Sequence, residues 1–251
     1  VFKRCLDCLL AQNYINLEII VIDNGSIKRT KDLLAEYADR LSLITLKEDH
    51  GACMPRNLGA NKASGEYLLF LDSDALLVEK DAISNSVKTL NDHTSLGAVG
   101  GVAFSDEKLE KLQHAQLKFK SPFEIDEQRK MSVPKSLCLD IDYIQTDFMM
   151  IKKKVFHDVG GFDHFFRYYP EDVDLSFRVL HLGYQIGISP EIKYCHQYRP
   201  RGVATDHGYF LKICYMYLKN RSIFQVLHYY ASFLKKGFFK ISGSKNISKK
   251  L

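Results

Sequence analysis

The chain lacks any apolar run long enough to cross a membrane. None of its windows approaches the roughly 18–20 uninterrupted apolar residues of a spanning helix, and we find no signal-peptide pattern at its start. The six cysteines show no paired ligand spacing, since Cys5 and Cys8 form one CxxC motif without the second half of a zinc site. We therefore expect a protein of the reduced cytoplasm whose cysteines serve neither zinc nor redox chemistry.

Acidic residues are absent from the last part of the chain. Residues 207–251 hold nine Lys or Arg and no Asp or Glu, whereas residues 1–206 carry 26 basic and 30 acidic groups. Apolar residues recur there at helical spacing, namely Phe210, Ile213, Tyr217, Ile223, Leu227, Tyr230 and Leu234. We predict a basic amphipathic helical tail over 206–251, of which 207–240 lies on an anionic membrane surface. Packing of this stripe on the protein's own body, or dimerisation through it, are the alternatives.

Short apolar runs alternate with helical patterns along the rest of the chain. We expect strands at residues 18–23, 43–46, 67–71, 97–104 and 192–194, and helices at 1–12, 31–40, 56–60, 79–92, 155–161 and 172–182. This alternation predicts an α/β protein with a mostly parallel sheet flanked by helices. Residues 106–133 are expected to form a surface excursion, with regular structure again at 141–151. Because no strand precedes the first helix, we expect a first strand to be missing and the chain to be truncated at its N-terminus.

Two carboxylates directly follow the third predicted strand. Side chains two apart on a strand face the same way, so Asp72 and Asp74 are expected to point in one direction. Ligands of α/β sheets bind at the carboxyl ends of the strands, and two oxygen ligands there suit Mg²⁺ or Mn²⁺ held partly by phosphate oxygens. The simpler alternative is that Asp72-Ser73-Asp74 caps the helix that follows.

Longer motifs accompany this pair in a fixed order. They are Ile22-Asp23-Asn24-Gly25-Ser26, Arg56-Asn57-Leu58-Gly59, Gly65-Glu66-Tyr67, Gly160-Gly161-Phe162-Asp163, Glu171-Asp172-Val173-Asp174-Leu175, Arg178, Gly183-Tyr184 and His196. Together they resemble family 2 glycosyltransferases of the GT-A fold, and the motif sequences are most similar to those of the rhamnosyltransferase-like branch. The resemblance implies a Rossmann-like GT-A domain over 1–205, with a donor half at 1–105 and an acceptor half at 135–205.

The resemblance also implies an activity. We expect a metal-dependent, hexosyltransferase-type enzyme that moves a sugar, with inversion, from a nucleotide-diphosphate donor to a hydroxyl group. UDP- or dTDP-sugars are the expected donors. A saccharide or lipid-linked acceptor in surface polysaccharide synthesis is the expected acceptor, reached from the cytoplasmic face of the membrane. No nucleic acid is expected as a partner, and a homodimer is left open.

Each matched position takes a role from the resemblance. Asp23 would accept a hydrogen bond from the imide N–H of uracil or thymine, and Arg56 would lie along the base or phosphates. Asp72 would hold the ribose or a metal-bound water, Asp74 would hold the metal, and His196 would complete the coordination of Mg²⁺ or Mn²⁺. The structural alternatives are an Asx-turn at Asp23, a solvated helix charge at Arg56 and a hydrogen-bonding role for His196.

A second acidic pair, Glu171-Asp172, is expected on the acceptor side. An inverting transfer needs a carboxylate to take the proton of the acceptor hydroxyl. The resemblance assigns this role to Asp172, with Glu171 sharing it or binding acceptor hydroxyls, although two carboxylates at a helix N-terminus are also ordinary electrostatics. Where relatives commonly have Gly-Ala, this chain has Thr146-Asp147, so Asp147 is expected to add a carboxylate near the acceptor.

Three other functions stay open on the sequence. Asp72-Ser73-Asp74 is similar to the strand end of haloacid-dehalogenase-type phosphatases, although Leu76 stands where those have Thr or Val. A nucleotidyltransferase has a comparable sheet, and a truncated or inactive relative that only binds partners or membrane is the non-catalytic alternative. The Gly160–Leu175 segment argues for glycosyl transfer.

Overall fold

The computed structural model describes residues 1–121, 124–130, 132–196, 207–220 and 227. Contacts between residues divide the chain into two compact units, Val1–Lys118 with Gln128–Val203 and Phe119–Glu127 with Ala204–Leu251. Every residue singled out above for catalysis or ligand binding lies in the first unit, whereas the predicted tail, 206–251, lies entirely in the second. The domain boundary at 205/206 itself stays a prediction.

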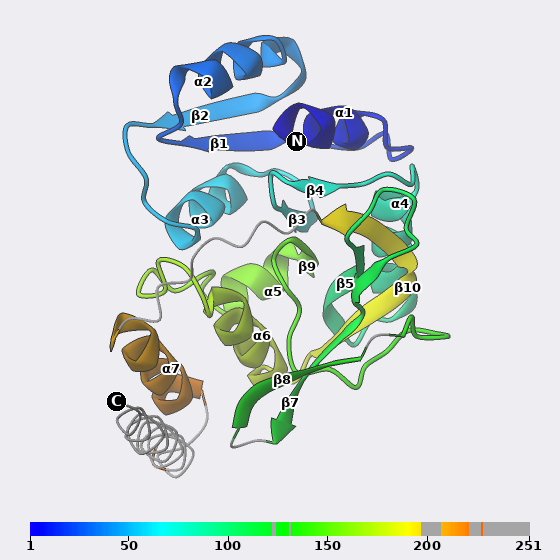
Figure 1. The fold of residues 1–251 in the computed structure, drawn as a ribbon, viewed down its shortest axis with the longest axis vertical. Coiled ribbons are helices and arrows are strands. Elements are labelled where there is room, and N and C mark those ends of the chain that lie inside the picture. Colours follow the sequence, from blue (N-terminus) through cyan, green and yellow to red (C-terminus); the bar gives the residue numbers. More distant parts are fainter. Residues whose placement is uncertain (122–123, 131, 197–206, 221–226, 228–251) are drawn as a thin grey trace, which may run out of the picture. The chain divides into compact units, whose positions relative to one another are not determined.

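A six-stranded mixed sheet forms the centre of the first unit (Figure 1). The strands lie in the order β3-β9-β5-β10-β4, with β6 paired to β5. Their bounds are β3 (Tyr67–Leu71), β4 (Ala75–Leu76), β5 (Leu96–Phe104), β6 (Leu112–His114), β9 (Phe148–Lys152) and β10 (Gln185–His196).

The pairing corrects the expectation of a mostly parallel sheet. Among the described strands of this sheet, β5 and β10 are the one parallel pair, and β9 runs antiparallel to both β3 and β5. The apolar run of β9 is buried on both faces, and such a run looks the same in the sequence whichever way the strand runs. The insertion of β9 between two strands of like direction therefore left no sequence signal.

A smaller sheet and a set of helices complete the first unit. The small sheet pairs β1 (Ile20–Asn24) in parallel with β2 (Ser42–Leu46). The helices are α1 (Phe2–Leu10), α2 (Lys28–Ala35), the 3₁₀ helix η1 (Ala38–Arg40), α3 (Cys53–Lys62), α4 (Ala82–Asp92), α5 (Lys153–Asp158) and α6 (Glu171–His181). Helix α3 packs on β1, α4 on β5 and β10, and α6 on β10. The α/β class predicted from the sequence is confirmed.

The strand β5 is buried along its whole length, and two of its glycines allow close packing. A Cβ atom at Gly100 would lie 2.6 Å from Ile144 and 2.8 Å from Ile188, and one at Gly101 would lie 2.6 Å from Ile192. Such contacts are too short in a close-packed interior. Glycine therefore lets β10 and the segment before β9 pack onto β5, and these two segments carry residues of the site described below.

Residues 106–133, expected as a surface excursion without regular structure, contain strands. Besides β6, the segment holds β7 (Gln116–Ser121) and β8 (Glu124–Lys130), which form a two-stranded sheet of their own. In β7, Leu117 and Phe119 alternate with polar residues, but β8 has Ile125 as its one apolar residue and lacks the two-residue alternation from which strands are predicted. Within 141–151, regular structure is confined to β9.

The second unit includes α7 (His207–Asn220), the helix described in the predicted tail. Ile213, Met216 and Tyr217 are buried, whereas Leu211 and Leu218 are exposed. In the parts of the chain that the structure describes, every helix is too short or too polar to span a bilayer. Most of the predicted membrane-binding segment, 207–240, lies outside the described residues, so membrane contact stays a prediction.

Candidate active site

The turn after β3 brings the first acidic pair together. Strand β3 ends at Leu71, and the Ala75 N–H donates to the Asp72 carbonyl at 3.0 Å, which closes a turn over residues 72–75. Asp72 and Asp74 therefore lie in a tight turn between β3 and β4. They were expected to point together because they lay on a strand, but the turn sets their directions instead.

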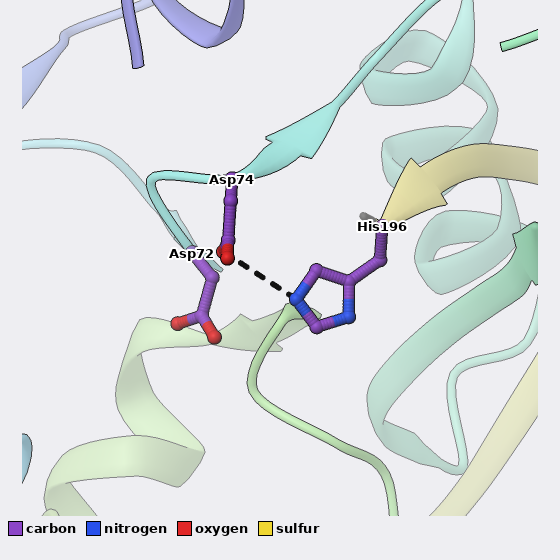
Figure 2. A group of neighbouring side chains, drawn as sticks. All are labelled: Asp72, Asp74 and His196. Carbon is purple, nitrogen blue, oxygen red and sulfur yellow. Dashed lines mark ion pairs between the residues drawn. The ribbon is translucent and has the colours of Figure 1, made fainter. Parts of the chain in front are cut away.

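Strand pairing places His196 beside this turn. Strand β10 pairs antiparallel with β4, so that His196 lies opposite Ala75. His196 Nε2 is 3.4 Å from Asp74 Oδ1, and one ligand atom from each of Asp72, Asp74 and His196 lies within 4.8 Å of the others. Figure 2 shows the Asp74 carboxylate facing the imidazole, with Asp72 beside them. We call these three side chains the ligand group.

The ligand group fits a divalent cation. Two carboxylates supply oxygen ligands that suit Mg²⁺ or Mn²⁺, and an imidazole suits Mn²⁺ better. The side chains of Asp72, Asp74 and His196 are 38%, 25% and 13% exposed, so a further ligand can reach them. Burial lowers the pKa of His196, but the carboxylates of Asp147 and Asp74 raise it to about 10. Metal binding requires the neutral imidazole, so a cation at this site would have to displace the proton on Nε2.

A buried carboxylate, Asp147, contacts the other side of the imidazole. Its Oδ2 lies 3.0 Å from His196 Nδ1 and 3.5 Å from His114 Nε2, and its Oδ1 accepts a hydrogen bond from the Tyr194 hydroxyl at 2.9 Å. Burial raises the pKa of Asp147, but the contacts with His114 and His196 outweigh it and hold that pKa far below its usual range. The prediction that Asp147 lies near the acceptor stays a prediction; this carboxylate is 5% exposed and lies against other side chains of the protein.

Arg56 on α3 joins the two acidic pairs. Its Nη2 donates to Asp72 Oδ1 and its Nη1 donates to Glu171 Oε1, each at 2.8 Å. The guanidinium also lies over the ring of Phe162, 5.6 Å from the centroid. One planar head group therefore contacts an acid from each pair, so the two pairs border the same site. A freely solvated charge, the alternative considered for Arg56, does not describe this side chain, which is 18% exposed.

Glu171 and Asp172 are the first two residues of α6, and both are buried. A helix N-terminus stabilises negative charge through its free N–H groups, and Asp172 Oδ1 accepts the N–H of Val173 at 2.8 Å. In the same turn Asp174 pairs with Arg178 at 2.7 Å. The second pair is thus held inside the domain by the start of the helix and, at Glu171, by Arg56.

Asp23 lies in β1, apart from the ligand group in the smaller sheet. Its Oδ1 accepts the N–H of Ser26 at 2.9 Å, which is the Asx-turn considered as the structural alternative. Its Oδ2 is buried and makes no hydrogen bond to any residue that the structure describes. Since a buried acceptor without a donor is unfavourable, Oδ2 is suited to an N–H group from a ligand.

Two residues next to the site were missed by sequence reasoning. His114 was given no role, and nothing near it on β6 marks it, because its partner Asp147 is distant in the chain. Tyr194 stands two residues before His196 on β10, and side chains two apart on a strand share a face. That alternation was the signal by which Tyr194 could have been found.

Carboxylates and an imidazole gathered at strand ends of a helix-flanked sheet define an α/β protein that binds its ligands at one edge of the sheet. The model of Glycosyl transferase family 2 matches residues 1–160 of the chain. Because the match covers more than half of its length, the chain belongs to glycosyl transferase family 2, and its fold is GT-A. The resemblance seen in the sequence motifs is confirmed.

Two curated relatives show how far the similarity extends. Glycosyltransferase AglE of Haloferax volcanii is 27% identical over 214 residues, which cover 80% of this chain and 64% of AglE. The O-antigen chain rhamnosyltransferase WbaN of Salmonella anatum is 25% identical over 187 residues, which cover 73% of this chain and 58% of WbaN. The chain thus spans less than two thirds of either relative.

A solved structure agrees at the level of the fold. The mannosyltransferase PcManGT from Pyrobaculum calidifontis, in complex with GDP-Man and Mn²⁺, superposes with a TM-score of 0.60 at 18% identity. The superposition covers 93% of this chain and 60% of PcManGT. At this identity the likeness concerns the fold alone.

Proposed function

We propose that this chain transfers a sugar, with inversion, from a UDP- or dTDP-sugar to a hydroxyl group of a saccharide or lipid-linked acceptor in surface polysaccharide synthesis. The observation that carries the proposal is the Arg56 guanidinium, which contacts Asp72 beside the ligand group and Glu171 at the start of α6. Acids for the donor and for the acceptor then border one site. Membership of glycosyl transferase family 2 supports this activity over phosphate hydrolysis.

On the donor side, Asp74, Asp72 and His196 would hold Mg²⁺ or Mn²⁺. Such a cation, when bound, supplies the positive charge that a departing nucleoside diphosphate needs. Asp23 Oδ2 would accept the imide N–H of the base, and this pairing is what favours uracil or thymine. Arg56 would lie along the base or phosphates. The similar mannosyltransferase structure holds Mn²⁺ and GDP-Man, which supports a nucleotide-diphosphate sugar and a divalent cation but not the choice of base, since its base is guanine.

On the acceptor side, Asp172 would act as the general base. The acceptor oxygen forms its bond to the anomeric carbon on the face opposite the diphosphate, the bond to the phosphate oxygen breaks, and the hydroxyl proton passes to Asp172. Glu171, held by Arg56, would bind an acceptor hydroxyl or share the proton. A carboxylate in this position speeds such a transfer by roughly 10²–10⁴-fold.

A panel of UDP- and dTDP-sugars with Mn²⁺ or Mg²⁺ tests the activity. Nucleotide release that needs both the cation and an acceptor saccharide is the expected result, and NMR of the product's anomeric proton should show inverted configuration. Asp32→Asn is the matched control for substitutions of the site carboxylates and should keep full activity. Asp32 is an exposed carboxylate on α2 whose partner is Lys28. Retained configuration, or full turnover in excess EDTA, would overturn the corresponding part of the proposal.

We further propose that the basic tail holds the enzyme at an anionic membrane near a lipid-linked acceptor. Each basic group near such a surface contributes about 1 kcal/mol, so neutralising Lys235, Lys236 and Lys240 to Gln should reduce flotation with anionic liposomes. The matched control neutralises Lys28, Lys88 and Lys154, which are exposed lysines of the first unit. Equal flotation of the two triple variants would overturn the proposal that the tail binds the membrane. Concentration-dependent dimerisation would favour the alternative that the tail is a dimer interface.

A further inference from the structure

We propose that Asp147 is a positioning residue that fixes His196 so that its Nε2 faces the cation site. The proposal rests on the proposed metal site. Asp147 itself does not belong to the ligand group, but Oδ2 of this buried side chain lies 3.0 Å from His196 Nδ1. On the opposite side of the same ring, Nε2 lies 3.4 Å from Asp74 Oδ1. A carboxylate at this distance from one imidazole nitrogen favours the ring proton on that nitrogen, which leaves the other nitrogen free to bind a metal.

Asp147 is itself held from several directions. Its Oδ1 accepts the Tyr194 hydroxyl and the Phe148 N–H, both at 2.9 Å. Its carbonyl accepts the N–H of Asp72 at 3.2 Å, so the backbone also connects it to the ligand group. His114 lies 3.5 Å from Oδ2, the same oxygen that faces His196. With Oδ1 occupied by two donors, Oδ2 is the oxygen available to the histidines.

This arrangement makes Asp147→Asn an informative substitution. The Phe148 N–H can only donate, so the carbonyl oxygen of the new amide must take the Oδ1 position, and the amide nitrogen takes the Oδ2 position. The amide then donates toward His196 Nδ1, which must become an acceptor. In that tautomer the ring proton resides on Nε2, the nitrogen that faces Asp74. A substitution of nearly the same size should therefore block the nitrogen that binds the metal.

Binding of Mn²⁺ alone to the full chain, followed by the EPR signal of free Mn²⁺, gives a readout that needs no turnover. We expect Asp147→Asn to weaken the Mn²⁺ affinity by about 10–100-fold. Pulsed EPR of the bound ion should show coupling to an imidazole nitrogen in the wild-type chain and lose it in Asp147→Asn and His196→Gln. Asp174→Asn is the matched control, because it changes a fully buried, ion-paired carboxylate that lies on α6 and should leave the coupling intact.

A double-mutant cycle separates positioning from a general loss of structure. If Asp147 acts through His196, Asp147→Asn should have little further effect on Mn²⁺ affinity in a His196→Gln background. An equal loss in both backgrounds would overturn the proposal and assign Asp147 a structural role through the Asp72 backbone. Should Asp147→Asn fail to fold, Tyr194→Phe removes one donor to Asp147, and we expect a few-fold weaker affinity; unchanged affinity would then overturn the proposal.

The outcomes also separate this proposal from the proposed function. If the wild-type chain binds no Mn²⁺, the metal site itself fails, and with it the role given to Asp147. If the wild-type chain binds Mn²⁺ without any nitrogen coupling, the carboxylates bind the ion without His196, and the positioning role of Asp147 is overturned. If binding and coupling are present but insensitive to Asp147→Asn, only the positioning role is wrong.

Discussion

The two acidic pairs of the site are held in different ways. Asp72 and Asp74 lie in a turn after a strand, partly exposed, with an imidazole beside them. Glu171 and Asp172 begin a helix and are buried, with a guanidinium on Glu171. Arg56 contacts one acid of each pair, but the second pair also lies at a helix N-terminus, whose free N–H groups compensate further negative charge.

This difference separates two kinds of chemical work. An exposed pair beside an imidazole keeps oxygen atoms available to an external cation, and the carboxylate of Asp147 adds to the negative field there. A buried pair on a helix is instead fixed in position, which suits a group that must meet one hydroxyl in one orientation. We therefore expect substitutions in the first pair to abolish turnover through loss of the cation. Substitutions in the second pair should lower kcat and leave donor affinity nearly unchanged.

The largest effect is expected at the first pair. Asp74→Asn should abolish measurable turnover and leave the fold intact, because the diphosphate cannot replace a lost protein ligand to the cation. Initial rates of nucleotide release over a range of Mn²⁺ concentrations measure the effect, and circular dichroism checks the fold. Asp32→Asn is the control and should keep the wild-type rate. A wild-type rate for Asp74→Asn as well would show that the first pair does not hold a cation needed for turnover.

At the second pair the loss should fall on kcat. Asp172→Asn is expected to lower kcat by roughly 10²–10⁴-fold with donor affinity changed only a few-fold, because a general base acts in the transition state. Steady-state kinetics together with donor binding by calorimetry distinguish the two terms. If Glu171→Gln is the crippled variant and Asp172→Asn is nearly normal, the assignment within the pair must be reversed.

Arg56 connects the two pairs, so Arg56→Lys tests how much this connection, the Arg56 bridge, contributes to stability. The lysine keeps the charge but has no planar guanidinium with which to contact Asp72 and Glu171 at once. Losing one charged hydrogen bond should lower the free energy of unfolding by about 1.5–3 kcal/mol, as measured by urea denaturation. Arg29→Lys, at an exposed position on α2, is the matched control, and equal stability of the two variants would show that the bridge is dispensable.

The elements of the site were predictable from the sequence to the extent that they lie in local motifs. Asp72 and Asp74 follow an apolar strand, and Glu171 and Asp172 open an amphipathic helix, so their placement depends on short segments. The bridge through Arg56 and the contact of His196 with Asp74 depend instead on which strands and helices pack together. The His196 contact follows from the antiparallel pairing of β10 with β4, which no local pattern encodes.

The position of Asp147 also depends on how the strands pack and not on a local motif. The apolar residues of β9 follow this residue, and because Thr146-Asp147 stands where relatives commonly have Gly-Ala, it was expected near the acceptor. Strand β9 runs antiparallel between β3 and β5, which reverses the edge of the sheet at which its first residue lies. The residue before β9 therefore meets the end of β3 and the Asp72 backbone. A parallel β9 would have placed Asp147 at the other edge, away from Asp72 and His196.

A carboxylate outside both pairs, Asp49, should show the smallest effect. It accepts hydrogen bonds from the Gly51 N–H and the Tyr168 hydroxyl, both at 2.8 Å, and pairs with Arg167 at 3.3 Å, so it connects the loop after β2 to the loop before α6. The hydrogen bond from Gly51, followed by those from Tyr168 and Arg167, lowers the pKa of Asp49 below its ordinary value of 3.8. Because this side chain is about half exposed, solvent screening limits the pair to about 1 kcal/mol or less.

The sign of the pH dependence follows from the direction of that shift. A carboxyl whose pKa is lowered on folding stabilises the protein above its ordinary pKa, and this contribution is lost as the pH falls through the folded value. The difference in free energy of unfolding between the wild-type chain and Asp49→Asn should therefore be at most about 1 kcal/mol at pH 7 and shrink between pH 5 and pH 3. Urea denaturation across this range measures it. A difference that grows toward pH 3 would show that Asp49 is not stabilised as a carboxylate. A cost of several kcal/mol at pH 7 would place this exposed contact on a par with the Arg56 bridge and remove the contrast between exposed and buried acids.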